Sequence, residues 1–205
     1  MLANIKERCN SLVKNFHEIS EERKLILENL TTYIQGKIDS NNPIQLNYIC
    51  THNSRRSLLG QLWAAVAADY FQVKNVSTFS GGTEATAFNA NAIEALTQAG
   101  FIIHPLDDTK NPMYQVFFDL EKSTNCFSKT YNHSSNPLEN FAAIMTCSDA
   151  DQNCPFILGC DVRIGTTYND PKAYDGSILQ KEKYTERSNQ IAMECLYVFS
   201  KLKTL

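Results

Sequence analysis

The sequence lacks the long apolar runs that mark membrane-spanning and secreted proteins. No stretch approaches the roughly 18 apolar residues that a transmembrane helix needs, so no membrane partner is expected. The N-terminal segment carries Lys6, Glu7 and Arg8 and has no apolar stretch of the kind found in a signal peptide. We therefore expect a cytoplasmic protein.

The chain also lacks an excess of charge of one sign. It has 19 Lys and Arg residues against 22 Asp and Glu residues, which gives a net charge of -3 at pH 7. A net charge so close to zero argues against a nucleic acid or an anionic membrane as the partner.

A regular cysteine framework is missing as well. The seven cysteines are odd in number and have no repeated spacing, which argues against a disulfide scaffold. In a reducing compartment, cysteines serve either the core or the chemistry of a protein. Cys9 and Cys195 fall on apolar faces of predicted helices and are expected in the core, whereas Cys126 and Cys160 receive no role.

The chain does contain an alternation of strand and helix patterns from residue 43 onward. The expected strands are 44–49, 74–80, 113–118 and 141–146, and the expected helices are 57–71, 92–99 and 179–202. Asn89 or Asn91 is the expected N-cap of the middle helix, and Gly100 is expected to end it. Such alternation predicts an α/β fold with a doubly wound parallel sheet and helices on both faces.

Residues 1–42 carry a different pattern. Apolar residues recur at helical spacing on both sides of Ile19 and Ser20, which predicts two amphipathic helices with Ser20 as the N-cap of the second. We therefore divide the chain into an N-terminal helical extension, residues 1–42, and a catalytic domain, residues 43–205. The extension is interpreted either as a cap on the domain or as a surface for a homodimer or another partner.

The stretch from Cys50 to Ser57 joins the first predicted strand to the next helix. In such a loop, successive backbone N–H groups and the helix N-terminus attract an oxyanion, and Arg56 can hold two of its oxygens. The same positive field favours the thiolate form of Cys50, to which the Ser57 hydroxyl can donate. The residues expected to contact the oxyanion are Thr51, His52, Asn53, Ser54, Arg55, Arg56 and Ser57. The alternative is a buried structural cysteine beside surface arginines. This alternative fits poorly, because the residues around Cys50 are polar and an inert structural thiol is usually surrounded by apolar side chains.

Cys147 and Cys154 follow the last of these predicted strands in a polar loop. The carboxyl ends of parallel strands meet at one edge of a sheet, so this loop is expected on the same edge as Cys50. The two sulfurs could meet if the loop folds back. The alternatives are half of a metal site, or two ordinary loop cysteines; because no second closely spaced pair is present, no metal is expected.

These motifs resemble those of the low-molecular-weight protein tyrosine phosphatases and, more closely, the related thioredoxin-coupled arsenate reductases. Residues 50–57 resemble the family's phosphate-binding loop, with His52 and Arg55 departing from the usual Gly and Cys. Residues 146–155 resemble the redox segment of the reductases. The resemblance implies a four-stranded parallel sheet, and it does not cover residues 1–42.

The Asp170-Pro171 step matches the aspartate that this family uses as a general acid. Lys172 stands where phosphatases of the family usually place an aromatic residue, which favours a small inorganic oxyanion as substrate.

Gln61 replaces the Glu through which some of the reductases bind potassium, so a potassium site would lack that ligand. His133 and Lys129, in a polar stretch, are expected at the surface.

The function implied by the resemblance is reduction of arsenate to arsenite, with Cys50 as nucleophile, Asp170 as acid and Cys147 and Cys154 as the resolving pair. Thioredoxin would restore the thiols, and no bound cofactor is needed because the cysteines supply the electrons. The alternative is a phosphatase that hydrolyses phosphate monoesters through a Cys50 phosphoenzyme. A third interpretation is a redox or oxyanion sensor without turnover.

Overall fold

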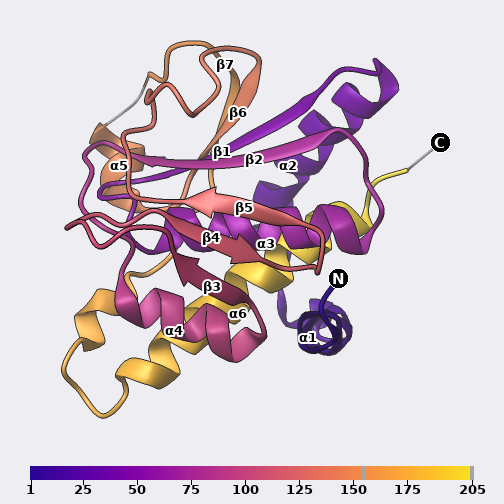
Figure 1. Cartoon of the computed structure of the whole chain (residues 1–205). Coiled ribbons are helices and arrows are strands. Elements are labelled where there is room, and N and C mark those ends of the chain that lie inside the picture. Colours follow the sequence, from indigo (N-terminus) through magenta and orange to yellow (C-terminus); the bar gives the residue numbers. More distant parts are fainter. Residues whose placement is uncertain (154–155, 204–205) are drawn as a thin grey trace.

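The computed structural model describes residues 1–153 and 156–203. Its centre is a parallel sheet of four strands in the order β2-β1-β6-β7 (Figure 1). The strands are β1 (Ile44–Cys50), β2 (Val76–Gly82), β6 (Phe141–Met145) and β7 (Cys160–Gly165). The predicted fold class, an α/β fold with a four-stranded parallel sheet, is confirmed.

Alternate residues of the central strands face two separate apolar clusters, as expected when both faces of a sheet are buried. Leu46, Tyr48 and Ile144 belong to the larger cluster, which includes side chains of α3 (Arg56–Tyr70), α4 (Ala90–Ala99) and α6 (Gln180–Ser200). Ile49 and Met145 belong to the smaller cluster, which includes α5 (Ser148–Asn153). The sheet therefore carries helices on both faces.

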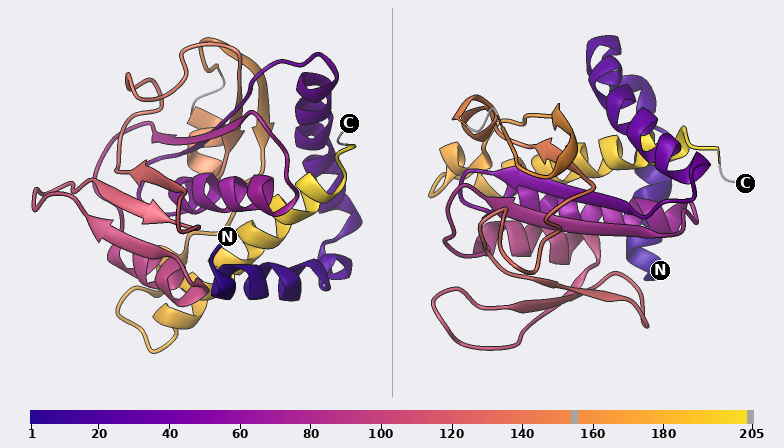
Figure 2. Two further views of the ribbon diagram at one scale, coloured as in Figure 1. Left: turned by 45° about the vertical axis from the view of Figure 1, so that its right-hand side comes forward. Right: turned by 90° about the horizontal axis from the view of Figure 1, so that it is seen from above.

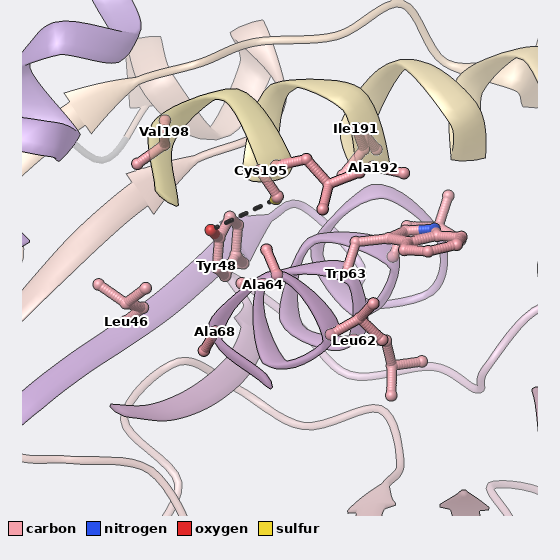
Figure 3. Close-up of a cluster of buried hydrophobic side chains, with 14 of the residues drawn as sticks. Leu46, Tyr48, Leu62, Trp63, Ala64, Ala68, Ile191, Ala192, Cys195 and Val198 are labelled. Atoms are coloured by element: carbon pink, nitrogen blue, oxygen red, sulfur yellow. Dashed lines mark hydrogen bonds between the residues drawn. The ribbon is translucent and has the colours of Figure 1, made fainter. Parts of the chain in front are cut away.

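Helix α3 lies close against β1 because small residues line their interface (Figure 3). At Gly60, any Cβ atom would collide with the ring of Tyr48. Trp63 is fully buried nearby, and its Nε1 donates a hydrogen bond to Ser188 Oγ of α6 at 2.9 Å. Cys195 lies in this core, 3.8 Å from the Tyr48 hydroxyl, as its position on an apolar helix face predicts.

One strand predicted for the parallel sheet belongs elsewhere. Residues 113–118 were expected in the parallel sheet, but β4 (Tyr114–Phe117) is the middle strand of a second, antiparallel sheet between β3 (Ile102–Pro105) and β5 (Ser123–Cys126). Only Val116 of β4 is fully buried, which suits a sheet with one covered face. The fourth parallel strand is instead β7, an edge strand whose polar residues hid it from the sequence pattern.

The N-terminal helices are α1 (Ala3–Val13) and α2 (Glu21–Asp39), joined by the short 3-10 helix η1 (Phe16–Glu18). The Ser20 side chain accepts a hydrogen bond from Arg23 N at 3.2 Å, which confirms the predicted N-cap. Figure 2 shows both helices beside α6, and their buried side chains belong to the larger core cluster. The division of the chain at residue 42 stays a prediction.

Two further local predictions are confirmed. Asn89 caps α4 by accepting hydrogen bonds from the N–H groups of Asn91 and Ala92, and Gly100 ends that helix in the left-handed conformation. Among the described residues, the search for a helix long and apolar enough to cross a membrane found none.

Candidate functional site

The site lies where β1 and β6 end side by side. These parallel strands pair in register, with Ile49 opposite Met145, so the residues that follow them emerge at the same edge. Thr146 continues the pairing, because its N–H donates to Ile49 O at 2.7 Å. Cys50 and Cys147 consequently share the smaller buried cluster of the sheet, as expected from their predicted positions at strand ends.

The loop after Cys50 is held by its carbonyl groups, which accept hydrogen bonds from two flanking segments. The bonds are Thr83 N to Cys50 O at 3.1 Å, Glu84 N to Thr51 O at 3.0 Å, Ser128 Oγ to His52 O at 2.8 Å, and Asn89 N to Ser54 O at 3.0 Å. Among the described residues, the backbone N–H groups of residues 52–55 donate to no protein acceptor. Because the loop carbonyl groups are bonded to the flanking segments and the N–H groups of residues 52–55 are free, these N–H groups form a cradle that can bind an anion.

Asn53 gives this loop its shape. Its backbone has a φ of 44°, in the left-handed region that Asn tolerates better than most residues. Its amide donates to Ser57 Oγ at 2.8 Å and accepts from Lys129 N at 2.9 Å. Gly82 permits the close approach of β2, since a Cβ there would lie 2.6 Å from Thr51 O and 2.7 Å from Asn53 N.

Cys50 lies beneath the loop with 3% of its surface exposed, and its Sγ is 3.1 Å from Ser57 Oγ. Because Ser57 Oγ already accepts a hydrogen bond from the Asn53 amide, its own proton is free to be donated to the sulfur. A donated hydrogen bond of this kind stabilises a thiolate, the form in which cysteine is a nucleophile.

Arg56 is buried at the start of α3 and connects the loop to the segment that carries Asp170. Its Nη2 donates to Asp170 Oδ2 at 2.6 Å, and its Nη1 donates to Tyr168 O at 2.9 Å. Within the described part of the chain, its buried Nε has no hydrogen-bond partner. An unpartnered, buried guanidinium N–H is costly, and an oxyanion would satisfy it.

Asp170 also forms the N-cap of η2 (Pro171–Tyr174), a 3-10 helix, by accepting from Lys172 N at 3.0 Å. The Asp-Pro step therefore places one carboxylate oxygen on the turn and the other on Arg56. This arrangement brings the acid predicted from the sequence next to the predicted oxyanion-binding arginine.

Cys147 is fully buried, and its Sγ lies 3.4 Å from Thr51 Oγ1 of the loop. The N–H of Ala150 also donates to this sulfur, at 3.4 Å. The second resolving cysteine, Cys154, lies outside the described residues. The structure thus brings together Cys50, Arg56, Asp170 and Cys147, and leaves the position of Cys154 as a prediction.

Comparison with known proteins finds relatives named as arsenate reductases. Arsenate reductase 2 of Staphylococcus epidermidis is 29% identical over 135 residues, a match that covers 65% of this chain and 83% of that protein. Arsenate reductase 2 of Staphylococcus haemolyticus is 32% identical over 111 residues, covering 54% of this chain and 65% of that protein. No family model matches the chain.

Solved structures show the same fold at lower identity. An arsenate reductase in its phosphate-binding state superposes with a TM-score of 0.50 and 15% identity, covering 78% of this chain and 99% of that one. A YwlE mutant from Bacillus subtilis superposes with a TM-score of 0.51 and 13% identity, covering 77% and 97%. The related sequences and the shared fold support the resemblance of this chain to the low-molecular-weight protein tyrosine phosphatase superfamily. The resemblance seen in the motifs is thereby confirmed.

Not every side chain of the loop after Cys50 faces the cradle. The Ser54 hydroxyl donates to Ala87 O at 2.6 Å, and His52 Nε2 lies 2.8 Å from Glu84 Oε1 at an exposed position. The guanidinium of Arg55 binds Tyr184 and Asp175 instead. For these three loop residues, the backbone N–H is therefore the group available to an oxyanion, while the side chain has another partner.

Lys129 was expected at the surface, and that prediction is wrong. It is 4% exposed, and its Nζ lies 4.7 Å from the centre of the Phe127 ring. Burial lowers its pKa, and its backbone N–H holds the Asn53 side chain. A lysine in a polar stretch gives no sequence signal of burial, because burial depends on how the folded chain surrounds it. His133, placed at the surface with it, is half-buried.

Gln61, at the position of the Glu through which some of the reductases bind potassium, is also buried. Its Oε1 accepts a hydrogen bond from Ser80 Oγ at 2.6 Å, and its Nε2 lies 3.5 Å from Thr124 Oγ1. The side chain therefore joins α3 to β2 beneath the loop, a structural role that the sequence did not indicate.

Proposed function

We propose that this enzyme reduces arsenate to arsenite through Cys50, Cys147 and Cys154, with thioredoxin as the reductant. The observation that carries the proposal is the second thiol beside the first. Cys147 lies in the same buried cluster as Cys50 and contacts Thr51 of the oxyanion loop. A phosphatase needs only a nucleophile and an acid at this edge of the sheet, whereas a reductase needs another thiol within reach.

The substrate would bind in the cradle of residues 51–57. Arsenate and phosphate have the same tetrahedral geometry, and either would accept hydrogen bonds from the free N–H groups of residues 52–55. The unpartnered Nε of Arg56 supplies a charged donor. The names of the relatives, arsenate reductases, favour arsenate as the substrate that is turned over.

The first chemical step is attack by the Cys50 thiolate on arsenic(V). A sulfur–arsenic bond forms and an arsenic–oxygen bond breaks, while Asp170 gives its proton to the departing hydroxyl, which leaves as water. Arg56 contacts Asp170 directly, so the donor of the proton lies next to the group that binds the oxyanion.

The second step uses Cys147. Its thiolate attacks Sγ of Cys50, the sulfur–arsenic bond breaks, and the electron pair of that bond remains on arsenic. Arsenic(V) becomes arsenic(III), arsenite leaves, and the two thiols are oxidised to a Cys50–Cys147 disulfide. Cys154 then attacks Cys147, which restores the Cys50 thiolate and leaves a Cys147–Cys154 disulfide for thioredoxin to reduce.

Because Cys147 is fully buried, its segment must move outward before a protein reductant can reach it. The sequence places Cys154 in the same loop, two residues before exposed Phe156. Transfer of the disulfide to this loop would carry the oxidising equivalents from the buried site to the surface.

The test is arsenate turnover with thioredoxin, thioredoxin reductase and NADPH, in the intact protein and in Cys147→Ala and Cys154→Ser. A phenyl phosphate ester is assayed in parallel, and Cys160→Ser, a half-buried thiol outside the relay, serves as the control. We expect arsenite formation to be lost in both relay variants and kept in the control.

The phosphatase alternative rests on the same loop, which fits phosphate as well as arsenate. It predicts ester hydrolysis through a Cys50 phosphoenzyme that survives both relay substitutions. Ester hydrolysis without any arsenite formation in the intact protein would overturn the reductase proposal and leave a phosphatase with an unused pair of thiols.

A further inference from the structure

The two consecutive arginines of the oxyanion loop hold opposite ends of one turn. Arg56 Nη2 binds Asp170, the N-cap residue of η2, at 2.6 Å. Arg55 Nη2 lies 3.4 Å from Oδ2 of Asp175, the residue that follows η2. The turn that carries the proposed acid is therefore attached to the loop at both ends.

The contact between Arg55 and Asp175 is supported by a buried side chain, Tyr184. Arg55 Nε donates to the Tyr184 hydroxyl at 2.7 Å, and that hydroxyl donates to Asp175 Oδ1 at 2.8 Å. Tyr184 is 1% exposed, and burial raises its pKa, so the phenol keeps the proton that it donates. Asn91 of α4 also lies 3.4 Å from Asp175 Oδ1. Asp175 is thus held by Arg55, the N-cap residue of α3, and by side chains from α4 and α6.

Apolar packing does little to hold this segment. Pro171 is buried, but residues 172–179 are all exposed, including Ile178, whose side chain is fully accessible. Its other hydrogen bonds are mostly local, such as Lys172 N to Asp170 and Ser177 N to Tyr174 O. A segment with few buried contacts opens easily unless polar attachments hold it.

The proposed reaction weakens the contact between Arg56 and Asp170. Arg56 must donate to the oxyanion while it also binds Asp170, and Asp170 must be protonated when it acts as an acid, which removes the charge that attracts the arginine. Asp175 has no such duty, and its contacts with Arg55 and Tyr184 persist throughout. One end of the turn would stay fixed while the other changes partner.

We propose that Arg55 is a positioning residue, which holds Asp175 so that Asp170 remains over the oxyanion loop while Arg56 binds the substrate. The inference rests on the proposed role of Asp170 as the acid. It also reassigns Arg55, which the sequence predicts as an oxyanion ligand, to the turn.

The test compares Arg55→Met with Lys181→Met. Lys181 is an exposed lysine on α6 whose ion pair with Glu94 joins α6 to α4, so its loss removes the same charge without touching the turn. Amide hydrogen exchange of residues 172–179 is measured with and without saturating inorganic phosphate. We expect faster exchange in Arg55→Met, with the largest difference when phosphate occupies Arg56, and no change in Lys181→Met.

The phosphate dissociation constant separates positioning from direct binding. An arginine that only holds the turn leaves this constant within about fivefold of the intact protein, the effect of losing one nearby exposed ion pair. Phosphate binding weakened by more than about tenfold would identify Arg55 as an oxyanion ligand and overturn the proposal. Exchange unchanged by Arg55→Met would overturn it as well.

Turnover supplies the functional readout. In Arg55→Met, kcat for arsenate should fall by about 10- to 100-fold, because a misplaced Asp170 loses part of the rate that a general acid supplies. KM should change little. Asp175→Asn should reproduce this loss, and the double variant should lose no more than either single one, because both remove the same attachment. If the losses of kcat in the two single variants instead add up in the double variant, Arg55 and Asp175 do not act through one attachment, and the proposal is overturned. If the intact protein lacks turnover, the proposed function fails, while the exchange and binding measurements still test the attachment.

Discussion

Two pairs of cysteines lie in different regions of this molecule, one pair at the strand-end edge of the parallel sheet and one in the helical core, and both pairs are buried to a similar degree. Cys50 and Cys147 at the edge are 3% and 0% exposed, and Cys9 and Cys195 in the core are 0% and 5% exposed. Exposure alone therefore does not separate the thiols proposed to react from the thiols that only fill space.

The surroundings of the sulfur atoms do separate them. Cys50 has the Ser57 hydroxyl at 3.1 Å and the cradle of N–H groups above it, and Cys147 has Thr51 and Ala150. In the core, burial raises the pKa of the Cys9 and Cys195 thiols to about 12, so both stay neutral. Burial outweighs the contact of Cys195 with the Tyr48 hydroxyl in the core, whereas at the sheet edge the donors beside Cys50 and Cys147 favour a reactive thiolate.

The sharpest test of this contrast is the loss of a whole thiol from each region. Cys50→Ser should reduce arsenite formation to the uncatalysed background, because a serine hydroxyl is not ionised at neutral pH. Cys195→Ala should keep its activity and lose stability, as expected for a side chain removed from a packed core. Turnover and thermal unfolding of both variants decide the matter; loss of chemistry in folded Cys195→Ala would contradict the division.

The next largest effect on turnover is expected from the charged side chain of Arg56, at the strand-end edge of the parallel sheet. Arg56→Lys should lower turnover by about 10²- to 10³-fold, the typical cost of losing an oxyanion donor, because a lysine cannot bind Asp170, Tyr168 O and an oxyanion together. The dissociation constant for phosphate should rise in the same variant. Unchanged phosphate binding would show that the unpartnered Nε of Arg56 does not serve the anion.

The hydroxyl of Ser57 distinguishes the two regions on a finer scale. Ser57→Ala removes the donor to Cys50 and should slow alkylation of that thiol at pH 6 by about 10- to 100-fold, since a hydrogen bond to a charged group is worth about 1.5–3 kcal/mol. Mass spectrometry of iodoacetamide-treated protein measures the rate at each cysteine. The same variant should leave Cys9 unmodified, which serves as the internal control.

The smallest effect concerns the core thiols at alkaline pH. Their pKa of about 12 in the folded protein exceeds the ordinary value of 9.0, so the unfolded chain releases these protons first as the pH rises. Stability conferred by the neutral thiols is complete below pH 9 and should fall by about 1.4 kcal/mol per pH unit for each thiol above it. Urea unfolding between pH 8 and 10.5 would show a shallower fall in Cys9→Ala than in the intact protein.

Local features of the fold were predictable from the sequence. Ser20 and Asn89 cap their helices and Gly100 ends one, because each acts on neighbours within a few residues. The strand character of residues 113–118 was also predicted, but their sheet was not. Pairing depends on partners distant in the chain, so the sequence pattern did not reveal that β4 lies between β3 and β5, or that the edge strand β7 completes the parallel sheet.

The site divides in the same way. The loop after Cys50 is contiguous, so a strand end, a thiol, an arginine and a helix start can be recognised together, and Cys147 follows from the rule that parallel strands end at one edge. Gly82, Tyr168 and Lys129 reach the loop from other segments, and nothing in their immediate sequence marks them.

The sequence by itself determined that Cys50, an oxyanion loop and a helix N-terminus occur together, because all of them lie within one short stretch. Only the tertiary structure decided which of the two arginines faces the oxyanion site and which binds the turn after Asp170. Arg55 and Arg56 carry the same charge, but Arg55 is the N-cap residue with a non-helical backbone (φ -136°, ψ -88°) and Arg56 begins α3, so their side chains point in different directions. One ends beside Asp170 with an unpartnered N–H, and the other ends on Tyr184 and Asp175.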